Sequence, residues 1–222
     1  MRKILLILIL TVALASVSSA ENVDSVQGEK RNTVHATFAF DPGFGIGAGY
    51  ARELQIRAID RVVLLSVDLS APMFLLDLQN YKLGIGTQIS LFESDWNVIN
   101  EFRVLNKGIS NAVYHGNLTS IEEGLLAGYF SDKWFVAIEA HFEKFLFAYM
   151  SHTEYYKGIY SDVKDGWYGS TGGKWRFALQ GGYTISDRVE PILRVGTYLH
   201  ERFSLPVFSM PVFGEVIVKV HF

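Results

Sequence analysis

Three polar residues at alternating positions could do chemistry together. Glu139, His141 and Glu143 are separated by Ala140 and Phe142, and residues two apart in a strand point to the same face. Two carboxylates beside an imidazole could ligate a metal ion or perform acid–base chemistry. One strand alone rarely closes a coordination sphere, and any strand with one polar face places its polar residues with the same alternation. We therefore assign no metal ligand, no catalytic residue and no cofactor.

A second set of residues has the types found in hydrolases and lies where outer loops are expected. Ser, His and Asp are also ordinary loop residues, and an enzyme would require a nucleophile and a base within hydrogen-bonding reach of each other. An enzyme acting on lipid or peptide at a rim is thus an alternative, with no residue assigned. The set comprises Ser151, His152, Asp162 and Asp165, together with His200, Glu201 and Ser204.

Charged residues recur on one face of several expected strands. Eight acidic and six basic residues share the inward parity, so the charges nearly balance. Buried charges need partners, and a barrel of this size is only slightly wider than one filled by its own side chains. We predict a paired polar network that narrows the lumen, with a polar permeation path as the alternative. The predicted network comprises Glu101, Arg103, Glu139, His141, Glu143, Arg176, Arg194, Glu215 and Lys219; the wider lumen set adds Glu53, Asp68, Glu122, Glu190, Lys82 and Lys174, with His35, His141 and His221 nearby.

The strand that best defines the architecture is the last one, from Val212 to Phe222. Its apolar row alternates with a mixed row, the pattern of a strand that faces two different environments. The stretch resembles the closing strand of bacterial outer-membrane β-barrels, whose assembly signal is a terminal Phe preceded by apolar residues at every second position. The matching residues are Val216, Val218, Val220 and Phe222, whereas Gly214 departs from the apolar row. The resemblance implies an outer-membrane location, with outer-membrane lipid and the barrel-assembly machinery as partners.

The amino-terminal residues have the pattern of an export signal. Residues 1–20 combine basic, apolar and small-residue regions, and the apolar run is shorter than the roughly 20 residues that a membrane anchor needs. We predict a signal peptide over 1–20, a flexible periplasmic leader over 21–31 and one barrel domain over 32–222. Removal of residues 1–20 takes away Arg2 and Lys3, which leaves 18 of the 20 basic residues and all 23 acidic ones. The formal charge of the mature chain is therefore −5.

Composition excludes several functions. The negative charge argues against a nucleic-acid partner. The absence of Cys excludes disulfides and thiolate metal sites. The mature chain is rich in apolar residues without a membrane-helix stretch, and only helices or closed barrels satisfy the backbone in lipid. These features together indicate a closed sheet.

Alternating segments between short breaks predict an all-β, antiparallel transmembrane β-barrel of meander topology. Breaks centred on Asp60, Asp95, Asp132 and Asp187 are typical of tight periplasmic turns. An even number of strands places both ends in the periplasm. Ten strands are predicted, with eight as the alternative if a weak turn such as Asp41-Pro42-Gly43 fails. The ten cover about 32–40, 43–56, 61–73, 81–92, 96–107, 118–130, 133–149, 173–184, 189–203 and 211–222.

The longest expected loop, residues 151–172, is rich in aromatic residues set among Gly and Ser. Flat amphipathic rings supply contact area at small entropic cost, and loops of this length are usually either functional or internally ordered. An outer contact surface and a self-packed lid over the barrel mouth both fit. The aromatic residues are Tyr155, Tyr156, Tyr160, Trp167 and Tyr168.

These patterns predict a porin-like envelope protein of a Gram-negative cell with a narrow charged lumen and a structural or surface-binding role. A small pore for ions or solutes is the first alternative, and a rim enzyme that modifies lipid or cleaves peptide is the second. The sequence identifies no extracellular ligand.

Overall fold

The computed structural model describes residues 32–40, 44–56, 61–73, 79–92, 94–169, 172–186, 188–200 and 212–222. The expected signal peptide, 1–20, and leader, 21–31, lie outside these residues, as do Asp60 and Asp187 at two of the expected turns. Among the described residues, no helix has the length and apolarity needed to cross a membrane.

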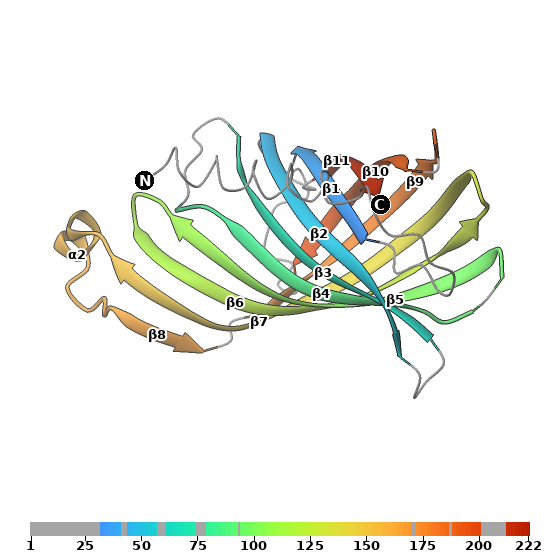
Figure 1. Cartoon of the computed structure of the whole chain (residues 1–222). Helices are drawn as coiled ribbons and strands as arrows, with labels where there is room; N and C mark the ends of the chain where they lie inside the picture. The colour runs from blue at the N-terminus through green and yellow to red at the C-terminus, as the bar shows by residue number, and fades with distance from the viewer. Residues whose placement is uncertain are drawn as a thin grey trace.

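Ten strands form a closed antiparallel barrel (Figure 1). Each strand pairs with the next along the chain, apart from the short β8, and the last pairs back with the first, with Thr33 opposite His221 and Phe40 opposite Gly214. The predicted ten-stranded meander is confirmed. Its strands are β1 (Asn32–Phe40), β2 (Phe44–Ile56), β3 (Arg61–Pro72), β4 (Lys82–Ser90), β5 (Trp96–Ser110), β6 (Tyr114–Phe130), β7 (Trp134–His152), β9 (Gly173–Tyr183), β10 (Val189–His200) and β11 (Val212–His221).

The weak break at residues 41–43 separates two strands, which excludes the eight-stranded alternative. Phe40 and Phe44 pair directly across β1 and β2, and their rings meet edge to face with centroids 5.5 Å apart. Pro lacks the backbone donor that a strand ladder requires. One long strand through Pro42 would therefore leave a gap in the hydrogen-bond ladder.

The expected long loop contains regular structure. β7 runs on to His152, the helix α2 (Glu154–Ile159) follows, and β8 (Gly166–Gly169) pairs back onto Phe147–Met150 of β7. β5 and β6 are also longer than predicted, reaching Ser110 and starting at Tyr114. Together they build a wall that extends beyond the rest of the rim in Figure 1, with α2 at its far end. We call residues 146–169 the arm.

A β-bulge near the base of the arm inverts the alternation of β7. Ser120 of β6 faces Phe145, whereas the adjacent Thr119 faces Phe147, so Leu146 is an extra residue. Below the bulge, Glu139, His141 and Glu143 point inward and are buried. Above it, Phe147 and Tyr149 are exposed on the outside while Ala148 is buried. A bulge redirects side chains in this way because two consecutive residues share one face.

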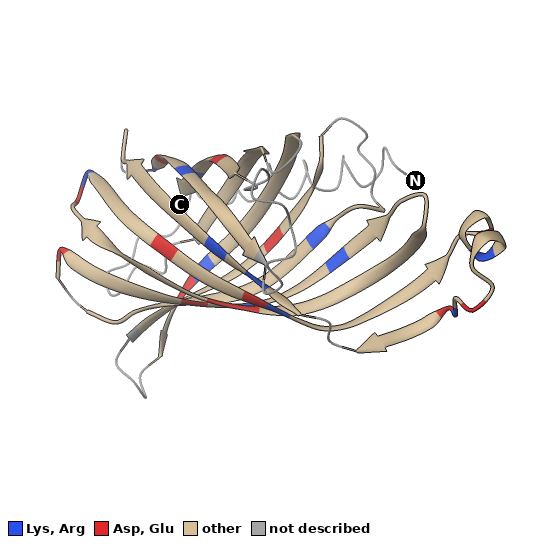
Figure 2. Cartoon of the chain, turned by 180° about the vertical axis from the view of Figure 1, so that it is seen from behind, with Lys and Arg blue, Asp and Glu red and all other residues tan. Residues whose placement is uncertain are grey.

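The two faces of the barrel differ in chemistry. Apolar side chains such as Ile85, Ile138, Leu179 and Leu193 are exposed on the outside. Figure 2 shows acidic and basic residues midway along the strands and at their ends. Apolar outside and polar inside is the arrangement of a barrel that lies in lipid.

Glycines face several of the large inward side chains directly across the ladder. Gly124 is opposite His141, Gly182 is opposite Phe135 and Gly196 is opposite Phe213. At each of these glycines an added Cβ would overlap the facing ring. The missing side chains therefore make the room in which rings from the neighbouring strand lie.

Candidate functional site

The centre of the lumen is organised around the imidazole of His141. Its Nδ1 lies 3.4 Å from Glu122 Oε1, and its Nε2 lies 3.3 Å from Glu101 Oε2 and 3.4 Å from Glu139 Oε1. The three carboxylates come from β5, β6 and β7. Carboxylate oxygens therefore lie on both sides of the ring, one near Nδ1 and two near Nε2.

Three arginines surround these carboxylates. Arg176 lies 2.7 Å from Glu139 and 3.8 Å from Glu122. Arg103 lies 3.9 Å from Glu101 and 3.8 Å from Glu122. Charged partners on several sides offset the cost of removing each group from water.

Arg194 extends the network toward the closing strand. Its Nε lies 3.0 Å from Glu139 and its NH1 donates to Glu215 of β11 at 2.8 Å. Its Nε and NH2 also donate to the side-chain oxygen of Gln180. Six of the ten barrel strands thus contribute to one network, which we call the central cluster: Glu101, Arg103, Glu122, Glu139, His141, Arg176, Arg194 and Glu215.

A smaller cluster lies toward the outer end of the lumen. Glu143 accepts a hydrogen bond from Ser120 Oγ at 2.5 Å and pairs with Lys107. Lys174 lies 3.6 Å from its other oxygen and places its ammonium 4.3 Å from the centre of the Tyr198 ring. Glu143 is therefore held by two cations rather than by His141.

The middle of the lumen is lined by buried charged residues. Glu101, Glu122, Glu139, His141, Glu143 and Arg176 expose only 1–5 % of their surface. At such exposures these side chains have almost no contact with water. Toward the periplasmic end, buried Leu126, Phe135, Ala137, Ile192 and Ile217 form an apolar layer. The lumen therefore contains a charged layer and an apolar one.

The predicted lumen residues occupy four places. Most lie in the central cluster, with Glu143 just above it. Lys219 lies apart, 3.8 Å from Glu190, which is 3.6 Å from His221. His35 and Asp68 form a separate pair at 2.8 Å. Within the described part of the chain, no group of three or more His, Cys, Asp or Glu residues is arranged to hold a metal ion.

Sequence reasoning missed two members of the lumen. Lys107 follows Glu101 and Arg103 at the same parity and ends the predicted strand 96–107, so parity alone could have found it. Ser120, which donates to Glu143, also has inward parity. It carries no charge, and a search for ionic residues alone passes over it.

Two of the residues with enzyme-like side chains at the rim, His152 and Asp165, form a structural contact in the arm. His152 Nδ1 lies 3.3 Å from Asp165 Oδ1, and the backbone N–H of His152 donates to the same oxygen at 2.8 Å. Lys157 donates to Asp165 Oδ2 at 2.8 Å. The Lys157 hydrogen bond, aided by the His152 N–H, lowers the pKa of Asp165 to about 2. Glu201 and Ser204 lie outside the described residues, as does the side chain of His200.

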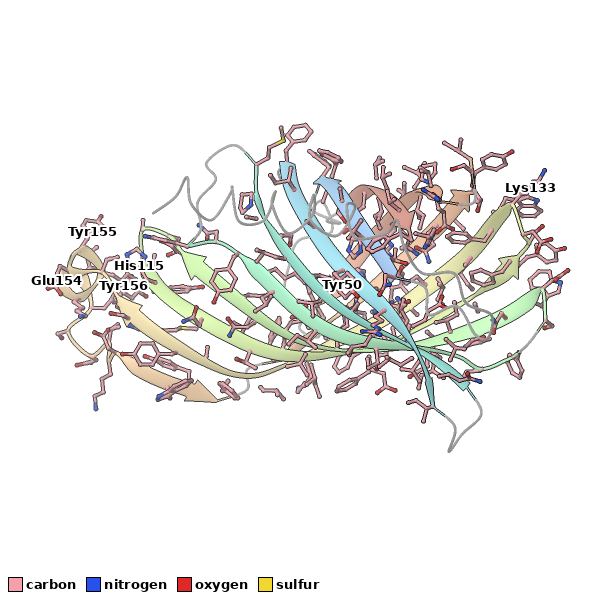
Figure 3. All side chains as sticks on the ribbon, viewed as in Figure 1. Tyr50, His115, Lys133, Glu154, Tyr155 and Tyr156 are labelled. Atoms are coloured by element: carbon pink, nitrogen blue, oxygen red, sulfur yellow. The ribbon has the colours of Figure 1, made fainter. Side chains whose placement is uncertain are left out.

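The arm is ordered by its own aromatic residues. His152 stacks on Tyr156, which contacts Tyr160 with ring centroids 4.9 Å apart. Thr153 caps α2 by accepting from the backbone N–H of Tyr156. Tyr155 is 75 % exposed at the tip, where Figure 3 places it beside Glu154 and Tyr156. Trp167, on β8, lies against Phe147 and Tyr149 of β7 instead.

No protein-family model and no curated protein matches the sequence. Among solved structures, the chain is similar to a KdgM porin at 9 % identity and a TM-score of 0.44, over 86 % of this chain and 99 % of that one. It is also similar to Neisserial surface protein A at 9 % identity and a TM-score of 0.37, over 87 % and 96 %. Both are similarities in shape at a level that assigns no function.

Proposed function

We propose that this chain is an integral protein of the bacterial outer membrane, with a closed lumen that does not conduct and an outer arm that is a contact surface. The apolar exterior supports the membrane location. Trp96, Tyr129 and Trp134 contact one another at the expected periplasmic end, and Phe142 contacts Trp175 toward the outer end. Paired aromatic girdles of this kind mark the two interfaces of barrels in lipid.

The proposed route to the membrane rests on the two ends of the chain. Residues 1–20 would direct export, residues 21–31 would form a leader, and Val216, Val218, Val220 and Phe222 would be read by the barrel-assembly machinery. The last strand is also where the barrel closes: Phe222 and Asn32 exchange two backbone hydrogen bonds, at 2.9 and 3.0 Å.

The observation that carries the non-conducting role is the burial of the central cluster. An open pore keeps its charged residues in water, whereas here they are paired with one another, and five of the eight members of the central cluster are buried. Moving an ion through would require breaking several buried pairs at once, and losing one partner of such a pair costs roughly 3–5 kcal/mol. This argument favours a structural or surface role over a pore.

Planar-bilayer recording tests the closed lumen. The purified wild-type barrel is expected to show no stable open-channel current. The double variant Glu139→Ala/Arg176→Ala removes a pair of opposite charges together, so no excess charge is created while space opens at the centre. This variant is expected to pass a measurable current in the same bilayer. A steady current from the wild type would establish the pore alternative instead.

The proposed contact surface is the tip of the arm, which presents Tyr155 and Tyr160 to solvent, with Tyr156 and Tyr168 packed behind them. Rigid aromatic residues on an ordered scaffold lose little entropy when a partner binds. The arm also stands clear of the strands that close the barrel (Figure 1). A partner that binds the tip would be extracellular.

A further inference from the structure

A second aromatic surface lies on the outward side of the arm, away from its tip. Trp167 contacts Phe147 with ring centroids 5.6 Å apart and Tyr149 with centroids 5.4 Å apart, both edge to face. Trp167 is 72 % exposed. Beside Phe147, the position of a Cβ on Gly169 has no atom within 4 Å. Three rings therefore frame an open shelf.

A set of neutral polar side chains continues this surface over β4, β5 and β6. The Tyr81 hydroxyl donates to Asn106 Oδ1 at 2.6 Å and lies 3.2 Å from Asn117 Oδ1. Asn106 Nδ2 donates to Thr119 Oγ1 at 3.3 Å. These contacts fix the amides while leaving part of their hydrogen-bonding capacity unused, because each amide has two donors and an acceptor with two lone pairs.

The polar and aromatic halves are directly adjacent. Across β6 and β7, Thr119 pairs with Phe147 and Asn117 pairs with Tyr149. The bulge at Leu146 is what makes them neighbours on one face, because without it Phe147 and Tyr149 would point the other way. We call this surface the outward patch; it comprises Tyr81, Asn106, Asn117, Thr119, Phe147, Tyr149 and Trp167.

The outward patch begins where the apolar exterior of the barrel ends. Val104 and Ile121, two positions below Asn106 and Thr119, are the last apolar pair on this side of β5 and β6. Phe142 and Trp175 hold the corresponding place on β7 and β9. A molecule that reaches the patch therefore stands beside the barrel in the membrane rather than over its mouth.

We propose that the outward patch binds the sugar headgroup of a glycolipid in the outer leaflet. A sugar ring presents an apolar C–H face, which packs on aromatic rings, and a rim of hydroxyls, which exchange hydrogen bonds with amides and hydroxyls. The patch offers both kinds of group side by side. The proposal rests on the membrane location proposed above, since only a membrane-anchored sugar is held at this height beside the barrel.

The test compares two tryptophans of matched exposure. Trp167→Ala removes the centre of the outward patch, and Trp96→Ala removes a tryptophan that is 71 % exposed and also packs edge to face on one tyrosine, but at the opposite end of the barrel. Each protein is placed in nanodiscs and titrated with three probes: a complete outer-leaflet glycolipid, the same lipid anchor without its sugars, and the free oligosaccharide.

Trp167→Ala is expected to weaken binding of the complete glycolipid by about tenfold, the loss typical of a central aromatic contact. Trp96→Ala should bind like the wild type, and all three proteins should bind the sugar-free anchor equally. Equal glycolipid affinity in all proteins would overturn the proposal, as would an equal loss for the sugar-free anchor. If the free oligosaccharide binds as tightly as the glycolipid, the ligand of the patch is a soluble glycan and the glycolipid proposal is wrong.

Two further readouts separate this proposal from its premise. Insertion into nanodiscs and heat-modifiable migration are measured first for every protein, and failure of the wild type in these assays would refute the membrane location. Loss of self-association in Trp167→Ala would show that the patch is an interface between two copies of the chain, which would overturn the glycolipid.

Discussion

At the scale of single residues, the positions of the side chains in the lumen depend on its glycines as much as on its charged residues. His141 reaches three carboxylates because Gly124, directly opposite on β6, leaves room for its ring. A glycine within a strand ordinarily weakens it. Here the missing side chain is what allows a ring to lie across the neighbouring strand, and the whole central cluster is built around that ring.

The substitution Gly124→Ala tests this dependence. The new methyl group would overlap the His141 ring, and displacing the ring disturbs all three carboxylates, so we expect the free energy of unfolding to fall by roughly 1–3 kcal/mol. Gly214→Ala is the matched control on β11, because a Cβ there has no atom within 4 Å. Denaturant unfolding of the refolded barrel measures both. Equal stabilities would show that the ring adjusts without loss.

At the scale of the element, a side-chain contact joins the two ends of the arm in addition to its aromatic packing. Asp165 joins the far end of the loop to His152 and Lys157. The backbone bonds of β7 and β8 cover only four residue pairs, Phe147–Met150 with Gly166–Gly169. The Asp165 carboxylate therefore links the segment between α2 and β8 back to the end of β7.

This contact gives the arm a defined dependence on pH. The pKa of Asp165 is lowered from 3.8 to about 2 by the Lys157 and His152 hydrogen bonds. A carboxyl group whose pKa is lower in the folded state stabilises that state above its unfolded pKa, and the contribution is lost as pH falls through the folded pKa. Order in the arm should therefore be complete above pH 4 and decrease as pH falls toward 2.

Near-ultraviolet circular dichroism of the stacked tyrosines would follow this transition. Asp165→Asn is the matched variant: it should show the low-pH spectrum of the arm already at neutral pH, with no change on acidification. A wild-type spectrum that is the same at pH 5 and pH 2 would show that the arm is ordered without the carboxylate.

Features that depend on local patterns could be predicted from the sequence, whereas features that depend on the register between strands could not. The ten strands and their faces could be predicted because an alternation of period two is local, and each strand carries it independently of its neighbours. The bulge at Leu146 could not, since it arises from the match between β6 and β7. The glycine and ring pairs depend on register in the same way. The helix α2 was missed because six residues with a Gly near the end carry little helical signal.

At the scale of the whole molecule, closure joins residues far apart in sequence. β1 and β11 pair over eight residue pairs, from Thr33 with His221 to Phe40 with Gly214. Thr33 Oγ1 and His221 Nδ1 lie 2.9 Å apart across this seam. The central cluster, by contrast, draws on β5 to β11 alone, and Arg194 meets Glu215 across β10 and β11. The charges of the central cluster can therefore pair before the seam between β1 and β11 closes.

A substitution at Phe222 tests its role as an assembly signal separately from the backbone hydrogen bonds that close the barrel. Phe222→Asp keeps the backbone bonds to Asn32 but removes the terminal aromatic ring, so we expect export to proceed while membrane assembly fails. Phe222→Tyr, which keeps a ring, should assemble normally. Cell fractionation measures both outcomes. Normal outer-membrane levels of Phe222→Asp would show that the last residue is not read as a signal.

The extra residue in β7 changes which positions of the strand point inward, from odd-numbered residues before Leu146 to even-numbered residues after it. Before the shift, the inward positions of the strand contribute His141 and two glutamates to the lumen; after it, Phe147 and Tyr149 face away from the axis. Because of this one inserted residue, the side chains of a single continuous strand face three different surroundings. These are the lumen, the hydrocarbon of the membrane and the layer above that hydrocarbon. Adding or removing one residue in the strand would therefore change which of its side chains point outward at the membrane surface. The backbone pairing that closes the barrel would stay the same.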